Sequence, residues 1–236
     1  MENIKYIFEE SIHNLDAPNE IVPIIMDLIN PKSVIDIGCG IGTFLYCFKK
    51  FGTKKILGVD GKWVNKSLLD KYLSPDEFLE FDIECPFEIN EKFDLVVSLE
   101  VAEHLCAESA DIFINNLISC GNVVLFSAAI PLQGGQNHVN EQWLDYWEEK
   151  FNNYNFVVHD VLKPLLWNNP KVFCWYKQNM VIFAHKDFIL SKKELKYNYL
   201  DKVVHYDLFL MNSIALRNAR KQIEEQNKII DRLTTK

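Results

Sequence analysis

The chain has 236 residues, of which 48% are hydrophobic, with a formal net charge of −8 and a pI of about 5.3. This composition supports one substantial core, and the acidic balance argues against binding to a nucleic-acid backbone, which needs a basic surface. The first residues, MENIKYIFEE, lack the pattern of a signal peptide, and no window approaches the roughly 20 apolar residues of a membrane span. We therefore expect a cytoplasmic protein with no membrane or nucleic-acid partner.

Helices and strands are expected to alternate along the chain. Residues 1–30 read as a helical segment with an apolar face, which Pro31 ends. From there, short apolar runs predict strands, and longer amphipathic runs predict the helices between them. The expected strands are residues 34–37, 55–60, 77–83, 92–100, 121–130, 155–162 and 179–185, and the expected helices include 64–73, 102–119 and 140–151.

This alternation predicts an α/β fold with a doubly wound, Rossmann-like sheet of seven mainly parallel strands. The segment 163–178 shows no periodicity and joins the last two strands, so we expect these two strands to pair in an antiparallel manner at the sheet edge. Three regions follow: the helical segment 1–30, a main domain 31–190 and a C-terminal helical tail 191–236.

The tail contains a heptad repeat, with spacings of three and four residues that are typical of a coiled-coil seam. Two interpretations stand: a coiled coil that pairs two subunits into a homodimer, or an amphipathic helix packed on its own domain. The seam positions are Phe209, Asn212, Leu216, Ala219, Ile223, Gln226, Ile230 and Leu233.

Six cysteines are present, and none forms the C-x-x-C pair of a zinc or redox motif. Several lie in apolar runs, so we expect reduced and mostly buried thiols. Cys39 lies inside a glycine-rich turn, where we interpret it as a small filling residue and not as a nucleophile.

The stretch SVIDIGCGIGTFL, residues 33–45, has the pattern of a strand, a tight turn and a helix. Its glycines, Gly38, Gly40 and Gly42, allow a positive φ and leave the backbone open to close approach by a ligand. No lysine follows them, which excludes a P-loop, and the third glycine comes one residue too early for the dinucleotide pattern G-x-G-x-x-G. The observed spacing, G-x-G-x-G, is the one used for S-adenosylmethionine.

Acidic residues at the ends of the next two strands fit the same ligand. Asp60 closes KILGVD 22 residues after Gly38, close to the offset of about 20 for a carboxylate that binds a ribose diol. A carboxylate suits a diol because it offers two acceptor oxygens. After the following strand, Asp82 is placed for the adenine amino group and Ile83 for the adenine ring.

Together these motifs resemble those of class I S-adenosylmethionine-dependent methyltransferases. VIDIGCGIGTFL resembles the first motif of that family, GVD the second, FDI the third and FDLVVSLEVAEHL the fourth, over roughly residues 20–185. The resemblance implies a seven-stranded sheet and S-adenosyl-L-methionine as the methyl donor. The implied cofactor-binding residues are Asp36, Gly38, Gly40, Gly42, Asp60, Gly61, Asp82, Ile83, Leu99 and Glu100.

The strand 92–100 leads into an E-x-x-E-H pattern formed by Glu100, Glu103 and His104. On a helix these three residues would share one face and be able to bind a divalent cation. The pattern occurs in some metal-assisted O-methyltransferases, but also in methyltransferases without a metal, where the histidine shapes the site. The second interpretation is preferred here, so no metal is expected, and Glu103 and His104 are catalytic candidates.

The loop GGQNHVNEQW, residues 134–143, follows the strand 121–130 and overlies the expected pocket. His138 is a candidate general base because its unperturbed pKa lies near neutrality. Asn140, Glu141 and Gln142 are placed to bind a polyol, unless Asn140 caps a helix instead. The stretch 167–179, WNNPKVFCWYKQN, adds aromatic and amide side chains that suit a sugar-like or nucleotide-linked ligand, or that cover the sheet edge.

The loop, the aromatic stretch and the helical tail together resemble small bacterial methyltransferases of surface-polysaccharide assembly. The resemblance implies O-methylation of a carbohydrate or nucleotide-activated sugar for a capsule or surface polysaccharide. No NPPY or DPPY tetrad follows the strand 92–100, which argues against methylation of base or amide nitrogens. A phosphorylated small-molecule acceptor and a non-catalytic scaffold that binds S-adenosylmethionine remain as alternatives.

Overall fold

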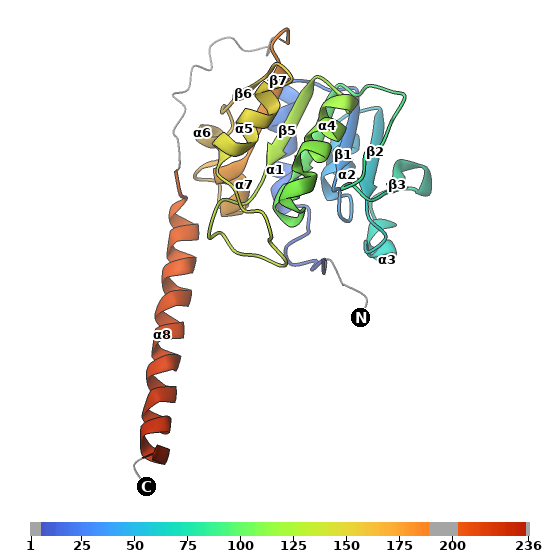
Figure 1. Ribbon diagram of the computed structural model, residues 1–236. Helices are drawn as coiled ribbons and strands as arrows, with labels where there is room; N and C mark the ends of the chain where they lie inside the picture. Colours follow the sequence, from blue (N-terminus) through green and yellow to red (C-terminus); the bar gives the residue numbers. More distant parts are fainter. Residues whose placement is uncertain (1–5, 189–202, 235–236) are drawn as a thin grey trace.

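The structure is a computed structural model that describes residues 6–188 and 203–234. Within these ranges one seven-stranded sheet forms, with the strand order β3-β2-β1-β4-β5-β7-β6 (Figure 1). The strands are β1 (Ser33–Ile37), β2 (Lys55–Asp60), β3 (Phe78–Glu80), β4 (Leu95–Leu99), β5 (Val123–Ser127), β6 (Phe156–His159) and β7 (Val181–His185).

Strands β1 to β5 pair in parallel, and β7 runs antiparallel to both β5 and β6. The predicted α/β, Rossmann-like sheet with an antiparallel last strand is therefore confirmed. The strand order reverses between β1 and β4, so the residues that follow these two strands meet at one edge of the sheet.

Helices cover both faces of the sheet (Figure 1). They are α1 (Asp16–Leu28), α2 (Thr43–Lys50), α3 (Lys66–Leu69), α4 (Ala110–Cys120), α5 (Leu144–Asn152), α6 (Lys163–Leu166), α7 (Cys174–Asn179) and α8 (Tyr206–Thr234), with 3-10 turns at η1 (Pro75–Glu77), η2 (Ala102–His104) and η3 (Ala107–Ser109).

The core has two layers because successive strand residues point to opposite faces. Val34 packs with the apolar residues of α1 and α2, whereas its neighbour Ile35 packs with those of α4 and α5. Both side chains are fully buried. A strand buried on both faces reads as a continuous apolar run, which is why the central strands could be located from the sequence.

Several predicted elements are shorter than expected. The helix expected at residues 102–119 starts only at Ala110, after two 3-10 turns, because Glu100 adopts a φ of +55° and interrupts the backbone path. Helix 64–73 is reduced to Lys66–Leu69, strand 77–83 to Phe78–Glu80, and helix 140–151 starts at Leu144. The segment 163–178, for which no periodicity was seen, contains α6 and most of α7.

The N-terminal segment is helical only from Asp16. Helix α1 belongs to the main core, since Ile21, Val22 and Ile25 are fully buried. Residues 6–15 contain no helix, and Phe8 and Tyr6 contact Gly40 and His104, which follow β1 and β4. The first five residues lie outside the described ranges.

The C-terminal helix α8 contains 29 residues and projects away from the rest of the molecule (Figure 1). The predicted tail begins at residue 191, and its residues 191–202 lie outside the described ranges. No helix within the described residues combines the length and the apolar character that a membrane crossing needs.

Candidate active site

The glycine turn after β1 has the backbone conformation that its glycines were expected to allow. Gly38, Gly40 and Gly42 have φ values of +85°, +54° and +84°, in the left-handed region that other residues rarely adopt. Gly42 is the N-cap of α2, and the amide of Gly38 donates to the Val59 carbonyl at 2.8 Å. The turn thus links the ends of β1 and β2 to the start of α2.

The bare faces of these glycines contact side chains of the protein itself, which differs from the expectation of an open turn. A Cβ on Gly38 would lie 2.4 Å from Val101, and one on Gly42 would lie 2.6 Å from Leu73. A Cβ on Gly40 would lie 2.7 Å from the ring of Phe8. Val101 and Leu73 are buried core residues, whereas Phe8 belongs to the non-helical N-terminal segment.

Asp60 lies at the end of β2 with its carboxylate directed at the turn. One oxygen accepts the amide of Gly40 at 2.8 Å, and the other accepts the amide of Gly61 at 2.6 Å. The residue is 5% exposed, and burial raises the pKa of its carboxyl group to about 6. The carboxylate therefore braces the turn, and each oxygen keeps a second lone pair for a further donor.

The other acids predicted for the cofactor occupy different environments. Asp36 is buried inside β1, where burial and the nearby Asp60 raise the pKa of its carboxyl group well above the usual value. Asp82 is exposed and follows β3 by two residues, and its carboxylate accepts the amide of Glu84 within a turn. Ile83 is buried in the core layer of α4 and α5. The strand that was to present Asp82 and Ile83 ends at Glu80.

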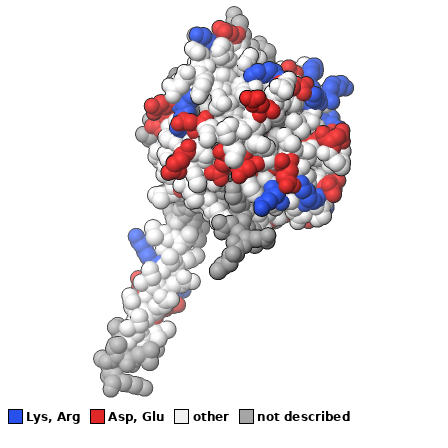
Figure 2. All heavy atoms as spheres, turned by 45° about the vertical axis from the view of Figure 1, so that its right-hand side comes forward, with Lys and Arg blue, Asp and Glu red and all other residues white. Residues whose placement is uncertain are grey.

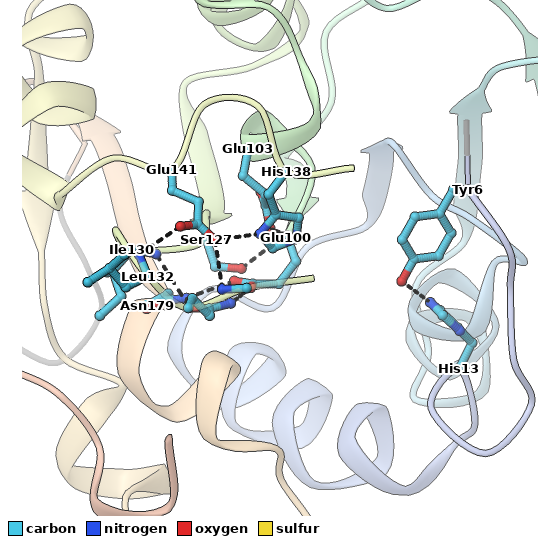
Figure 3. A network of polar contacts seen from close by, with 12 residues as sticks. Tyr6, His13, Glu100, Glu103, Ser127, Ile130, Leu132, His138, Glu141 and Asn179 are labelled. Carbon is cyan, nitrogen blue, oxygen red and sulfur yellow. Dashed lines mark hydrogen bonds and ion pairs between the residues drawn. The ribbon is translucent and has the colours of Figure 1, made fainter. Parts of the chain in front are cut away.

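Glu100 follows β4 and is held by amide side chains from distant parts of the chain (Figure 3). Its two oxygens accept Nε2 of Gln133 at 2.7 Å and Nδ2 of Asn179 at 3.1 Å. Its own amide donates to Ser127 on β5. Burial raises the pKa of the Glu100 carboxyl group, and these hydrogen bonds oppose that rise.

Glu103, His104 and His138 form a compact cluster beside Glu100. One ligand atom from each residue lies within 4.8 Å of the others. Nε2 of His138 lies 4.0 Å from Oε1 of Glu103, and the imidazole rings of His104 and His138 meet edge to face at 4.8 Å. The expected helical face of Glu100, Glu103 and His104 is wrong, because η2 is a 3-10 turn and His138 takes the place of Glu100 in the cluster.

The electrostatics of this cluster fit a cation. Glu103 is fully buried, and neither of its carboxylate oxygens has a hydrogen-bond partner of normal geometry among the described residues, although the backbone amides of Glu103 and Ala129 lie close enough to lower its pKa in part. Burial and the charge of Glu100 raise the pKa of Glu103 well above the usual value. Burial and His138 lower the pKa of His104 to about 4, and its Nδ1 likewise lacks a hydrogen bond within residues 6–188 and 203–234. A carboxylate and two imidazoles form a donor set that suits divalent transition metals.

Glu141 and Gly135 position the imidazole of His138. Oε1 of Glu141 contacts Nδ1 of His138 at 2.8 Å, which fixes this nitrogen as the N–H side when the ring is neutral and directs the Nε2 lone pair toward Glu103. Gly135 leaves room for the ring, since a Cβ there would lie 2.2 Å from it. The backbone carbonyl of Glu103 accepts the amides of Val139 and Asn140 and so joins the loop to η2. Asn140 caps no helix, because α5 begins at Leu144 with Trp143 as its N-cap.

The N-terminal segment spans the glycine turn and the carboxylate cluster. The side chain of Gln136 accepts the amide of Ile7 at 3.1 Å and donates to its carbonyl at 3.2 Å. Tyr6 meets His104 edge to face at 5.2 Å, and its hydroxyl lies 3.3 Å from Nε2 of His13 (Figure 3). Together with the contact between Phe8 and Gly40, these contacts place residues 6–8 over both the glycine turn and the cluster of Glu103, His104 and His138.

A small cavity of about 30 Å³ lies beside Asn179, on the β5 side of the site. Its walls include the aromatic side chains of Trp143 and Trp147 and the amides of Gln142 and Gln178. The indole N–H of Trp147 is buried and has no acceptor within the described part of the chain. Of the aromatic stretch 167–179, only Gln178 and Asn179 line this cavity, whereas Trp167 packs against His205.

Gln133, Gln136 and Asn179 were missed as site residues by the sequence reasoning. They come from the loop after β5 and from the end of α7, far from Glu100 along the chain. The dense polar composition of residues 133–142 was the available signal, but it did not specify which side chain each amide would meet.

Comparisons with known proteins place this site in a family context. The family described as "Methyltransferase domain" matches residues 13–169. The mitochondrial ubiquinone biosynthesis O-methyltransferase of Dictyostelium discoideum is 29% identical over 117 residues, which are 43% of this chain and 36% of that protein. The chain thus spans about a third of the length of this curated relative.

Two solved structures share the fold at low sequence identity. The methyltransferase domain of bacterial CtHen1-C has a TM-score of 0.54 and 19% identity, covering 72% of this chain and 98% of that one. DesVI of Streptomyces venezuelae also has a TM-score of 0.54, with 13% identity, covering 76% of this chain and 99% of that one.

Proposed function

The chain belongs to the methyltransferase domain family, and from that premise we propose that it is an S-adenosylmethionine-dependent O-methyltransferase that uses a divalent cation to hold a small polar acceptor. The observation that carries the proposal is the carboxylate of Glu103, which is fully buried beside two histidines with no hydrogen-bond partner among the described residues. Burial without a compensating charge disfavours the ionised form of Glu103 and raises its pKa, and a cation bound beside it would favour the ionised form instead.

Glu103, His104 and His138 would hold the cation. Glu100 adds a second carboxylate charge beside them, and Glu141 keeps Nε2 of His138 directed at the cluster. A cation bound there would lower the pKa of a coordinated hydroxyl group and fix its oxygen. Since the sequence pattern alone favoured no metal, this proposal rests on the contribution of His138, which the sequence did not connect to Glu103.

The glycine turn and the strand-end acids are proposed to hold the cofactor. Asp60 keeps free lone pairs beside the turn and suits the ribose diol, while Asp82 and Ile83 are proposed for adenine. Asp36, Gly61 and Leu99 complete the proposed lining. Bound S-adenosylmethionine would supply an activated methyl group on its sulfonium. The acceptor oxygen would bond to the methyl carbon as the carbon–sulfur bond breaks, S-adenosylhomocysteine would leave, and the hydroxyl proton would pass to a base.

The proposed acceptor is a hydroxyl of a carbohydrate or nucleotide-activated sugar. The cavity next to Glu100 supports this class, because Trp143 and Trp147 offer aromatic faces and their neighbours offer amides. The buried N–H groups of Trp147 and Asn140 are available donors within the described structure. At about 30 Å³ the cavity suits one polar group of the acceptor, with the rest of the acceptor outside it.

The proposal is tested by titrating metal-free protein with Mn²⁺ and Mg²⁺ in a calorimeter, with and without S-adenosylhomocysteine. Binding of one cation per chain, lost in Glu103→Gln and retained in Glu108→Gln, is the expected result. Glu108 is a suitable control because it lies in the following turn and is exposed.

Activity is then measured with a panel of nucleotide-activated sugars, by mass spectrometry for the gain of one methylene unit. Turnover that a chelator abolishes supports the full proposal. If a chelator leaves turnover unchanged, the cation is rejected from the proposal, and His138 is assigned the role of general base. Cofactor binding without turnover on any sugar removes the acceptor class.

A further inference from the structure

Helix α8 exposes an apolar stripe along its length. Leu208 is its last buried residue, and from 209 to 230 every side chain except the half-buried Ser213 is exposed. Phe209, Leu216 and Ile223 lie seven residues apart and are 63%, 54% and 56% exposed. Figure 2 shows that the visible surface of this helix is mostly uncharged.

A helix of 29 residues is about 43 Å long, and its own hydrogen bonds leave it marginally stable in water. Most helical stability in proteins comes from packing of an apolar face. For α8 this packing is supplied by the domain only near Leu208, where the helix meets α7. Residues 209–230 are therefore not buried against the domain, and Asn212 is hydrogen-bonded to it through Leu132.

We propose that α8 pairs with α8 of a second copy of this chain, through the seam of Phe209, Leu216 and Ile223. A row with a seven-residue repeat is complementary to itself, because each side chain fits the gap between two others on the facing helix. Asn212 and Gln226 lie within the seam. Polar residues at such positions fix register and strand number at a cost in stability, which is useful only for a defined partner helix.

The charges of α8 favour a second copy over a lipid surface. Helices that bind membranes carry an excess of Lys and Arg on the polar face. In α8 the basic residues are Arg217, Arg220, Lys221, Lys228 and Arg232, and the acidic residues are Asp207, Glu224, Glu225 and Asp231. The two signs nearly balance, and they alternate in blocks along the helix.

Pairing would also affect the candidate active site, because α8 is hydrogen-bonded to the loop after β5. Nδ2 of Asn212 donates to the carbonyl of Leu132 at 2.8 Å. The amide of Leu132 donates to Glu141, which contacts His138. The side chain of Leu132 is 86% exposed. We infer that the second copy covers this base of α8 and so stabilises the loop that positions His138.

Sedimentation velocity on the full chain, over about 1 to 100 µM, tests the pairing without any measure of activity, so its outcome is independent of the proposed function. The expected result is a species of twice the chain mass, converted to monomer in Leu216→Asp/Ile223→Asp. Ile214→Asp is the matched control, since Ile214 is 48% exposed and lies off the seam. A wild-type protein that stays monomeric throughout, or a dimer that survives the double substitution, overturns the pairing.

Hydrogen exchange tests the coupling in the same proteins. Amides of residues 132–139 are expected to exchange about tenfold faster in the monomeric double variant than in Ile214→Asp, while those of the central strands stay unchanged. Equal exchange of the loop in both variants overturns the coupling. Faster exchange of the strands would show that the double substitution damages the fold. Asn212→Ala, which removes both the hydrogen bond to Leu132 and one polar residue of the seam, then decides whether the loop depends on α8, provided that sedimentation shows this variant to be dimeric.

Discussion

The two halves of the active site are held in different ways. The turn half, comprising residues 36–42 and 58–61, is fixed by backbone hydrogen bonds and by Asp60, whose two oxygens both accept amides. The carboxylate half, comprising residues 100–104 and the loop 130–142, is fixed largely by side chains from distant segments. Within the described residues it leaves the carboxylate oxygens of Glu103 without a hydrogen-bond partner of normal geometry. The first half is built for stability, whereas the second retains polar groups that a ligand would satisfy.

The largest expected effect is that of Glu103→Gln, which separates binding from stability. Affinity for Mn²⁺ should fall by more than about 100-fold, because even outer-shell partners of a metal site contribute about 10–100-fold. Metal-free protein should gain about 1–2 kcal/mol in free energy of unfolding, since a buried amide costs less than a buried carboxylate. Calorimetry and urea unfolding measure the two effects, and a loss of stability together with unchanged affinity would place Glu103 among ordinary structural residues.

Substitution of a turn glycine should lower the free energy of unfolding, whereas Glu103→Gln should raise it. Gly38→Ala is expected to lose about 3 kcal/mol of unfolding free energy, because it combines a positive φ with a clash against Val101. Gly134→Ala, in the loop of the other half, should lose only about 1 kcal/mol, since its φ is +74° but nothing lies within 4 Å. Equal losses in urea unfolding would remove the claimed difference between the two halves.

Asp60 gives the turn half a pH dependence. Burial raises its pKa to about 6 in the folded protein from a usual 3.8, so the native state binds the proton more tightly than the unfolded state does. Relative to Asp60→Asn, wild type should therefore lose about 3 kcal/mol as the pH rises from about 4 to about 6, and little beyond. Thermal unfolding of both proteins across this range checks the prediction, which a pH-independent difference would contradict.

The smallest effect is expected for a substitution in residues 6–8, which lie over both halves of the site. Phe8 is only partly buried at the margin of the core, and Phe8→Ala opens the face of Gly40. S-adenosylhomocysteine should therefore associate and dissociate about three- to tenfold faster, with stability lowered by about 1 kcal/mol. Stopped-flow fluorescence measures the rates. Glu10→Gln is the control, because Glu10 lies in the same segment but pairs with Lys71. Rates equal to those of Glu10→Gln would show that Phe8 does not limit the access of S-adenosylhomocysteine to its site.

The turn half could be predicted from the sequence because its information is local. A buried apolar strand, three glycines and an acid at the next strand end lie within residues 33–60, and the positive φ values of the glycines follow from steric rules. The side chains that cover the glycines belong to other segments and could not be predicted from this stretch. The ends of weaker elements were wrong for the same reason: β3 pairs only three residues, so Asp82 lies in a turn. The sequence pattern does not show where hydrogen bonding to a neighbouring strand stops.

The carboxylate half depends on contacts that no local pattern specifies. The sequence predicts Glu103, His104 and His138 as site residues but does not connect them, because the 33 residues between His104 and His138 include a whole helix and strand. Glu100 was grouped with them on helical spacing, which its positive φ breaks. Its true partners, Gln133 and Asn179, are amides whose hydrogen bonds depend on the tertiary fold.

Gln136 connects the turn half and the carboxylate half of the site through its hydrogen bonds to Ile7. Its side chain hydrogen-bonds both backbone groups of Ile7 and belongs to the same loop as His138, so residues 6–8 cannot move away from Gly40 without breaking these contacts. Under the proposed function, access of the cofactor and access of the acceptor would therefore be coupled. An inhibitor that bound against residues 6–8 and held them in place would then block the cofactor and the acceptor together.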